Sequence, residues 1–121
     1  MGRKTLESLP GKKGLSGRKN VVLTRDENFS AEGVDTICHS IEELMQVLKD
    51  DDNAFVIGGA KVYEQLLPLC DTCYITKIYG KFPADAYFVN MDEMKEFKVT
   101  WQDELMEDNG ITYRFMKYER Q

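Results

Sequence analysis

The chain has 121 residues, of which 42% are apolar and 31% charged, a composition typical of one globular domain over residues 1–121. Its 16 Lys and Arg against 21 Asp and Glu give a net charge of -5. This balance disfavours nucleic acid and anionic membranes as partners, because both bind basic surfaces. No apolar run is long enough to span a membrane, and the start MGRKTLESLP lacks the apolar core of a signal peptide. The expected location is therefore the cytoplasm.

The three cysteines are Cys38, Cys70 and Cys73. An odd number without a secretion signal disfavours a disulfide framework. The C-D-T-C spacing resembles that of zinc or redox motifs, but there is no second pair and His39 is the only histidine. Cys73 also belongs to an alternating strand pattern, which favours an apolar role. We expect three free thiols and no metal site.

The first half of the chain predicts short strands and helices. A helix is expected in GRKTLESL, ended by Pro10-Gly11, and strands are expected in RKNVVLT and VDTICH. Ser40 begins a second helix, because the segment Ser40–Glu43 fits a capping box. The acidic run at residues 50–53 ends that helix as a solvated turn. Apolar residues repeat at helical spacing after Ser40: Ile41, Leu44, Met45 and Leu48.

The second half changes from helix to hairpins. AFVI at residues 54–57 predicts a buried strand, and Gly58-Gly59 separates it from a helix. The strand CDTCYITKIY follows, and then AYFVN, FKVTWQDELM and ITYRFMKYER, with Asn109-Gly110 as a turn, predict an antiparallel meander. The fold class is therefore α/β with a mixed sheet. The helix after Gly59 is expected to present these apolar side chains on one side or beside it: Val62, Tyr63, Leu66, Leu67 and Leu69.

Three segments have the chemistry of a phosphate-binding pocket. Gly2–Thr5 begins a helix and supplies free N–H groups, two cations and a hydroxyl. Gly58–Lys61 follows the expected buried strand, at the sheet edge where ligands of open α/β sheets bind. Thr24 and Arg25 end another strand. Each of the first two segments alone is better explained as a helix start with exposed charges, since neither is G-x-G-x-x-G or a P-loop. Together they predict a pocket for an extended polyanion such as a dinucleotide.

Four segments resemble dihydrofolate reductase in order and spacing: MGRKTLESL, GRKNVVLTR, VIGGAKVYEQLLP and YRFMKYER. The G-G-x-x-[VIL]-[YF] pattern also occurs in riboflavin-pathway reductases, whereas GRKT followed by GRKN and an aromatic meander favours dihydrofolate reductase. The resemblance extends over essentially the whole chain. It implies a mixed, mainly parallel sheet flanked by helices, with a C-terminal antiparallel hairpin. It also implies NADPH-dependent reduction of dihydrofolate to tetrahydrofolate.

The resemblance implies a cofactor site as well. In the family the peptide corresponding to Gly58-Gly59 is cis and borders NADPH, an arrangement that glycine tolerates. Arg3–Thr5 matches the segment that holds the cofactor phosphates. Thr24 and Arg25 match the positions that select the 2′-phosphate of NADPH over NADH, and a guanidinium suits a phosphate dianion. The implied cofactor contacts are Gly2, Arg3, Lys4, Thr5, Leu23, Thr24, Arg25, Ile57, Gly58, Gly59, Ala60, Lys61, Val62 and Tyr63.

On the substrate side, Arg18 matches the arginine that pairs with the glutamate-tail carboxylate of folates. Thr76 matches the threonine that orders water and the pterin amino group, and Thr76 and Tyr63 are the residues expected to support catalysis. The implied partners are dihydrofolate and antifolate-like small molecules. The implied substrate contacts are Leu9, Leu15, Arg18, Ile57, Tyr63 and Thr76.

The start of the chain departs from the family pattern. Family members begin with several dozen residues that have no match here, including a central strand, a lid, a P-W-x-x-P-like segment and the acid that contacts the pterin. The only tryptophan is Trp101, and no Asp or Glu matches that acid. We therefore expect an N-terminally truncated domain that lacks the first strands, has no catalytic carboxylate and has little or no reductase activity by itself. We also expect self-association through an exposed sheet edge.

Two other functions stay open. One is reduction of a pyrimidine intermediate of riboflavin synthesis, which Arg18 disfavours because that substrate carries a phosphoribityl group in place of a carboxylate tail. The other is a non-catalytic nucleotide-binding fragment, which the unmatched carboxylate favours.

Overall fold

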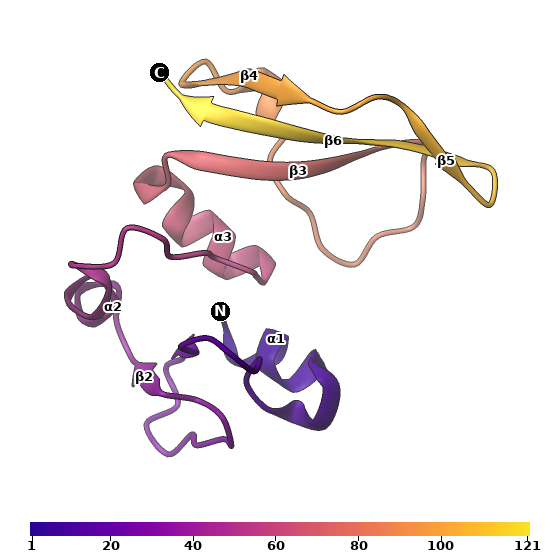
Figure 1. The fold of residues 1–121 in the computed structure, drawn as a ribbon. Helices are drawn as coiled ribbons and strands as arrows, with labels where there is room; N and C mark the ends of the chain where they lie inside the picture. The colour runs from indigo at the N-terminus through magenta and orange to yellow at the C-terminus, as the bar shows by residue number, and fades with distance from the viewer. The chain divides into compact units, whose positions relative to one another are not determined.

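The computed structural model describes all of residues 1–121 and divides into two compact units, Met1–Leu66 and Leu67–Gln121 (Figure 1). The first unit contains α1 (Arg3–Ser8), the 3-10 turn η1 (Pro10–Lys12), β1 (Val21–Leu23), β2 (Thr36–Cys38), α2 (Ile41–Leu48) and α3 (Ala60–Leu66). The second contains η2 (Leu67–Leu69), β3 (Thr72–Tyr79), η3 (Met91–Glu93), β4 (Phe97–Gln102), β5 (Met106–Asp108) and β6 (Ile111–Arg120). None of the helices has the length and apolar character needed to cross a membrane.

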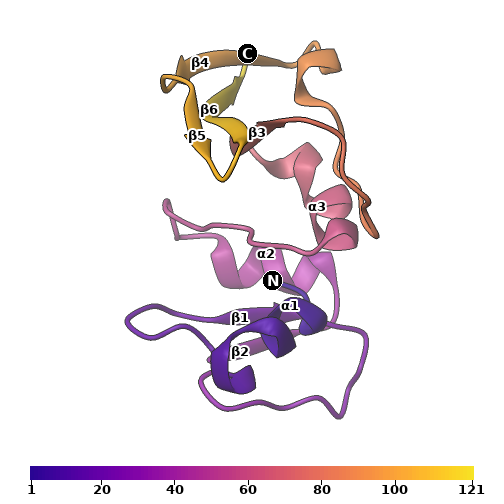
Figure 2. The same cartoon turned by 90° about the vertical axis from the view of Figure 1, so that its right-hand side faces the viewer.

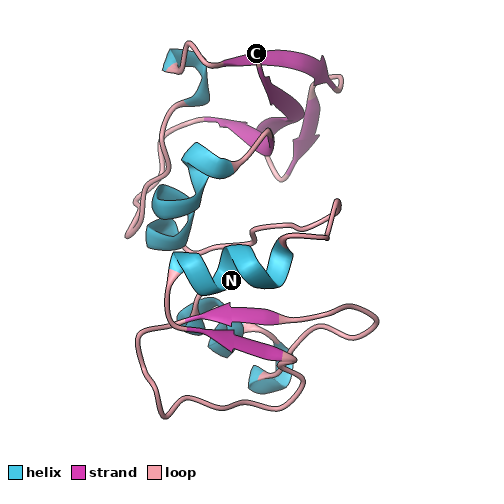
Figure 3. Ribbon diagram, turned by 90° about the vertical axis from the view of Figure 1, so that its left-hand side faces the viewer, coloured by secondary structure: helices cyan, strands magenta, loops and turns pink.

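The first unit is built on a parallel pair of short strands. β1 and β2 pair in the register Val21↔Thr36 to Leu23↔Cys38, and they lie side by side in Figure 2. Helix α2 lies over this pair (Figure 3) and buries Leu44 against Cys38. Helix α3 adds Val62 and Leu66 to the same apolar cluster. The core of this unit therefore lies where the strand pair packs against α2 and α3.

The start of α2 confirms the predicted capping box. The Ser40 hydroxyl accepts a hydrogen bond from the Glu43 N–H at 3.1 Å. In return the Glu43 carboxylate accepts one from the His39 N–H at 3.1 Å, one residue earlier than in the usual box. The imidazole Nδ1 of His39 lies 2.9 Å from the Thr24 carbonyl oxygen, which connects the ends of β1 and β2.

The second unit is an antiparallel sheet of order β3-β6-β4, and β5 pairs with the first three residues of β6, Ile111–Tyr113. Strand β6 coincides with the predicted segment ITYRFMKYER. Asn109 and Gly110 join β5 to β6 with φ angles of 51° and 79°. Positive φ at both central residues is the geometry of a two-residue hairpin turn, and Asn-Gly adopts it readily. The predicted C-terminal hairpin is confirmed.

Two predicted strands do not form. AFVI at residues 54–57 pairs with no strand, and Phe55 is 64% exposed. AYFVN at residues 86–90 is also irregular, because Asn90 caps η3 by accepting a hydrogen bond from the Asp92 N–H at 3.0 Å. The predicted strand FKVTWQDELM is too long, because β4 ends at Gln102 and, of the remaining residues, only Met106 lies in a strand, at the start of β5. Leu69 is 55% exposed, since α3 ends at Leu66 and Pro68 cannot continue the helix.

The three cysteines are free thiols, as predicted. Cys38 is buried and belongs to the core of the first unit, whereas Cys73 packs against the core of the second. Burial raises the pKa of each thiol above its ordinary value. Thiols of this kind stay protonated and react slowly, which is consistent with an apolar role.

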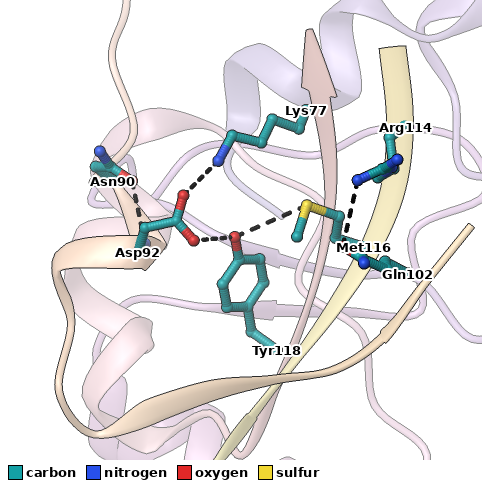
Figure 4. Close-up of polar contacts among 7 residues, drawn as sticks. All are labelled: Lys77, Asn90, Asp92, Gln102, Arg114, Met116 and Tyr118. Carbon is teal, nitrogen blue, oxygen red and sulfur yellow. Dashed lines mark hydrogen bonds and ion pairs between the residues drawn. The ribbon is translucent and has the colours of Figure 1, made fainter. Parts of the chain in front are cut away.

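A polar network holds η3 against the sheet of the second unit (Figure 4). The Tyr118 hydroxyl donates a hydrogen bond to the Asp92 carboxylate at 2.7 Å, and the Lys77 ammonium forms an ion pair with the same carboxylate. The bonds from Lys77 and then Tyr118 hold the pKa of Asp92 below its usual value. Burial, followed by the bond to Asp92, raises the pKa of Tyr118 to about 12. Met91 is thereby kept in the core beside Tyr118.

We expect Tyr118→Phe to lower the free energy of unfolding by about 1 kcal/mol at neutral pH, because the partly buried hydrogen bond to Asp92 is lost. In the wild-type chain the neutral phenol contributes fully below the pKa of about 10 that tyrosine has when unfolded. That contribution disappears as the pH rises toward about 12. The stability difference between the two proteins should therefore shrink through this alkaline range.

Urea titrations at neutral and alkaline pH measure this difference. The matched control is Tyr87→Phe, since Tyr87 is 81% exposed and should affect stability at neither pH. A stability difference for Tyr118→Phe that stays constant into the alkaline range would contradict the assigned role of the phenol.

Candidate functional site

Gly2 joins three segments of the first unit that are distant in sequence. Its N–H donates a hydrogen bond to the Gly58 carbonyl at 2.9 Å. On its other side it forms a parallel bridge with Leu23, whose N–H donates to the Met1 carbonyl at 2.9 Å. The Gly2 carbonyl accepts from the Leu6 N–H at 3.2 Å and so begins α1. The start of the chain, the end of β1 and the double glycine therefore share one set of main-chain bonds.

The glycines at this junction are required by the space around them. A Cβ atom on Gly2 would lie 3.1 Å from a methyl carbon of Val62 on α3, tighter than a normal contact. Gly58 has a φ angle of 119°, a conformation that L-residues rarely adopt. The Thr5 hydroxyl would lie 3.3 Å from a Cβ on Gly58 and 3.5 Å from one on Gly59. The Gly58-Gly59 peptide is cis, as the family resemblance implied.

The three segments that meet at Gly2 also carry cations without an ion pair. Arg25, Lys4 and Lys61 are exposed, and none of them forms an ion pair. Arg3 differs, because its guanidinium lies 3.6 Å from the Glu7 carboxylate and 3.5 Å from that of Asp26. The segments predicted to bind cofactor phosphates thus offer three cations whose charge is not neutralised within the protein.

Two hydroxyl-bearing side chains lie at the same junction. Thr24 follows β1, where its N–H donates to the Cys38 carbonyl at 2.9 Å and its hydroxyl accepts from the Asp26 N–H at 3.2 Å. Tyr63 is half-buried at the second turn of α3, where its N–H donates to the Gly59 carbonyl at 2.9 Å. Burial raises the pKa of Tyr63, so its phenol stays neutral near neutral pH.

A cavity of about 380 Å³ lies within the first unit. Three of the six predicted substrate contacts line it, namely Leu15, Arg18 and Ile57. Its other apolar walls come from α2 and from the extended segment before Gly58. The lining residues are Met1, Leu15, Arg18, Lys19, Asn20, Val21, Leu44, Val47, Leu48, Asp51, Asn53, Ala54, Phe55, Val56, Ile57 and Leu66.

The other three predicted substrate residues are not among those that line this cavity. Leu9 follows α1 and does not line the cavity, and neither does Tyr63. Thr76 belongs to the second unit, where it is exposed on β3 opposite Phe115 of β6. Within the first unit, the structure therefore joins the predicted cofactor segments through Gly2 and brings three substrate residues into one cavity.

Sequence reasoning missed several cavity residues. Val47 and Leu48 belong to the apolar side of α2, and such a pattern does not distinguish a core position from a cavity wall. Phe55 was expected inside a strand, and Asp51 in a solvated turn. The only earlier signal was the run AFVI, because an apolar segment that ends in two glycines is suited to contact a ligand.

The arrangement suits a ligand with two chemically different parts. Exposed cations and hydroxyls at the Gly2 junction can bind phosphate oxygens through charge-assisted hydrogen bonds. The cavity offers apolar walls for an aromatic group, and the Arg18 guanidinium can pair with a carboxylate at one end.

Comparison with known proteins agrees with this chemistry. A family model for dihydrofolate reductase matches residues 1–120. The dihydrofolate reductases of Staphylococcus haemolyticus and Staphylococcus aureus are 37% and 41% identical to this chain. Those alignments cover 99% and 96% of this chain, and 71% and 70% of the relatives' own length. The dihydrofolate reductase of Bacillus subtilis is 34% identical over 99% of this chain and 70% of its own length.

A solved structure gives the same result. Dihydrofolate reductase from Enterococcus faecalis, complexed with NADP(H) and RAB-propyl, superimposes with a TM-score of 0.83 at 30% identity. The match covers 98% of this chain and 71% of that one. The predicted α/β fold class and the family resemblance are both confirmed, but the strands of these 121 residues are not mainly parallel, because β1–β2 is a parallel pair and the three pairings of β6 are antiparallel. The chain belongs to the dihydrofolate reductase family, whose members are NADPH-dependent oxidoreductases that reduce dihydrofolate.

Proposed function

We propose that this chain binds NADPH at the Gly2 junction and reduces 7,8-dihydrofolate to 5,6,7,8-tetrahydrofolate beside it. The observation that carries the proposal is the main-chain connection of Gly2 to both Leu23 and Gly58. That connection joins the three segments whose residue types suit a phosphorylated dinucleotide. The Enterococcus faecalis relative is a complex with NADP(H), which supports the choice of cofactor.

The residues at the junction fit such a cofactor. NADPH supplies the hydride when it is bound. Gly2, Gly58 and Gly59 carry no side chains, so a ligand can come close to their main-chain groups. Thr5 and Thr24 supply hydroxyls. Arg25 is the best candidate for the 2′-phosphate, because its guanidinium is exposed and unpaired.

The cavity is the proposed position of the folate. Leu15 and Ile57 offer apolar surface to the ring systems, while Arg18 offers a guanidinium to the carboxylate of the glutamate tail. These features favour a folate over the phosphoribityl pyrimidine of riboflavin synthesis, since that substrate lacks an aromatic ring joined to a carboxylate tail. We propose dihydrofolate and antifolate-like molecules as the ligands of this cavity.

We expect the chain to prefer NADPH over NADH, and Arg25→Ala to remove most of that preference. Losing a charge-assisted hydrogen bond to the 2′-phosphate should weaken NADPH binding about tenfold to a hundredfold, with little effect on NADH. Calorimetric titration with both nucleotides measures this. Because the contact is ionic, the affinity for NADPH should also fall as the salt concentration rises.

Lys95→Ala is the matched control, because it removes one exposed positive charge from the second unit. Equal affinities of the unaltered chain for the two nucleotides would reject the proposed site. Equal losses from Arg25→Ala and Lys95→Ala would reject the role of Arg25.

We also expect the 121-residue chain to turn over slowly. Reduction needs a proton delivered to the substrate as well as a hydride, and Asp51 is the only carboxylate that lines the cavity. That carboxylate already accepts a hydrogen bond from the Asn53 N–H at 2.8 Å. Loss of a general acid typically slows an enzyme about 10²- to 10⁴-fold.

Dihydrofolate-dependent oxidation of NADPH, measured beside the Staphylococcus aureus relative under identical conditions, tests this expectation. A rate lower by the factor just given is expected. A rate equal to that of the relative would show that proton delivery needs nothing beyond the groups in these 121 residues.

We further propose that β3 mediates self-association with a second copy of the chain. Its hydrogen-bonded neighbour is β6, so its other edge carries main-chain groups with no paired strand. Tyr74 and Ile78 on this strand are 64% and 51% exposed. A long, apolar edge strand is a common site of pairing between chains.

Sedimentation velocity over a range of concentrations should therefore detect a dimer. Ile78→Lys should weaken the dimer because it adds a charge to the edge strand. Val89→Lys adds the same charge at an exposed residue outside any strand, and it should have no effect. A monomer at every concentration would overturn this proposal.

A further inference from the structure

Asn20 is a buried polar residue that none of the roles above accounts for. It is 5% exposed and lies directly before β1, beside the cavity. Burying an amide is costly unless its hydrogen-bonding groups are satisfied. The contacts of Asn20 therefore indicate what it holds in place.

The side chain of Asn20 closes the loop that precedes it. Its Oδ1 atom accepts a hydrogen bond from the Leu15 N–H at 2.9 Å. Its Nδ2 atom donates to the Leu15 carbonyl at 2.8 Å and to the Arg18 carbonyl at 2.9 Å. The Asn20 side chain thus fixes the main chain at Leu15, which supplies an apolar contact to the cavity, and at Arg18, which supplies its guanidinium.

The backbone of Asn20 is anchored on the opposite side. Its N–H donates to the Asp35 carboxylate at 2.6 Å. Its carbonyl accepts from the N–H groups of Asp35 at 2.9 Å and Thr36 at 3.3 Å, at the start of β2. Every polar atom of Asn20 is therefore bonded, and together these bonds connect the loop to the parallel strand pair.

The other end of the loop has no room to shift. Gly14 donates its N–H to the Glu32 carbonyl at 3.1 Å. A Cβ atom on Gly14 would lie 2.1 Å from the Gly33 carbonyl oxygen and 2.7 Å from the Asn20 amide carbon. The loop at residues 14–20 is therefore confined by a neighbouring loop as well as by the Asn20 amide.

Asparagine is the residue type that this position needs. The amide must accept one hydrogen bond and donate two, and neither a carboxylate nor an aliphatic side chain does both. Aspartate keeps the shape and the acceptor, but it cannot donate to the two carbonyl oxygens. Asn20→Asp therefore removes the bonds to the Leu15 and Arg18 carbonyls and hardly changes the volume of the side chain.

We propose that Asn20 is a positioning residue for folate recognition, which acts by holding Arg18 and Leu15 at the wall of the cavity. This role rests on the proposed function of the cavity. Asn20 acts through Arg18, so it affects most strongly the affinity for ligands that carry a glutamate tail. The cofactor segments do not depend on it, since none of its hydrogen bonds reaches Gly2, Thr24 or Gly58.

Equilibrium binding of folic acid and pteroic acid, both with NADPH present, tests this role, because pteroic acid lacks the glutamate. Asn20→Asp should weaken folic acid binding at least about tenfold, in line with the loss of a well-placed charge-assisted hydrogen bond. Pteroic acid should lose clearly less affinity, and NADPH should keep its own. Asn109→Asp, an exposed change of the same chemistry in the second unit, should alter none of the three affinities.

A second background separates positioning from general damage. In an Arg18→Ala chain, Asn20→Asp should cause no greater loss for folic acid than for pteroic acid, because the guanidinium that it positions is gone.

Amide hydrogen exchange gives an independent measure, since Asn20→Ala should expose the Leu15 N–H while Asn20→Asp leaves its acceptor in place. Equal losses for folic acid, pteroic acid and NADPH would overturn the proposal and indicate a purely structural residue.

Asp35→Ala covers the case in which Asn20→Asp does not fold. Asp35 is exposed, and Asp35→Ala removes the carboxylate that accepts the hydrogen bond from the Asn20 N–H. A smaller loss is expected, again confined to folic acid. No loss in any variant would also overturn the proposal. If the unaltered chain binds NADPH but neither folate, the cavity is not a folate site, and the proposed function fails along with this role.

Discussion

The candidate site depends on the pairing of one buried glycine with main chain on both of its sides. Buried backbone N–H and C=O groups must be paired, and Gly2 satisfies this by bonding to Gly58 and bridging to Leu23. Because these partners come from different parts of the sequence, the pairing itself assembles the site. The absence of a side chain is part of the same constraint, since Val62 occupies the space that a Cβ atom would need.

The two compact units differ in the contacts that stabilise each of them internally. In the first, short strands contribute few ladder bonds, and single residues such as Gly2 and Asn20 complete the main-chain pairing. In the second, β6 pairs with three other strands, and side-chain contacts from Asp92 and Arg120 attach the flanking turns. All the candidate binding residues except Thr76 lie in the first unit, where many backbone groups are positioned by loops rather than by a continuous sheet.

Local signals in the sequence predicted the features that depend on neighbouring residues. The capping box at Ser40, strand β6 and the turn at Asn109 each follow from residues a few positions apart. AFVI and AYFVN were wrongly predicted as strands, because a strand also needs a partner, and apolar composition does not supply one. The hydrogen bonds of Asn20 were not predictable either, since GRKN reads equally well as an ordinary start of a strand. The family resemblance supplied the proposed roles of Arg18 and Arg25, which periodicity alone does not indicate.

The most direct test of the Gly2 junction as the cofactor site is an NMR titration of the chain with NADPH, followed through the backbone amides. If NADPH binds at this junction, the largest shift changes fall in three separate segments, Gly2–Thr5, Leu23–Arg25 and Gly58–Tyr63, and they saturate together with a single affinity. Saturable binding with shift changes confined to other residues, or to only one of these segments, would contradict this assignment.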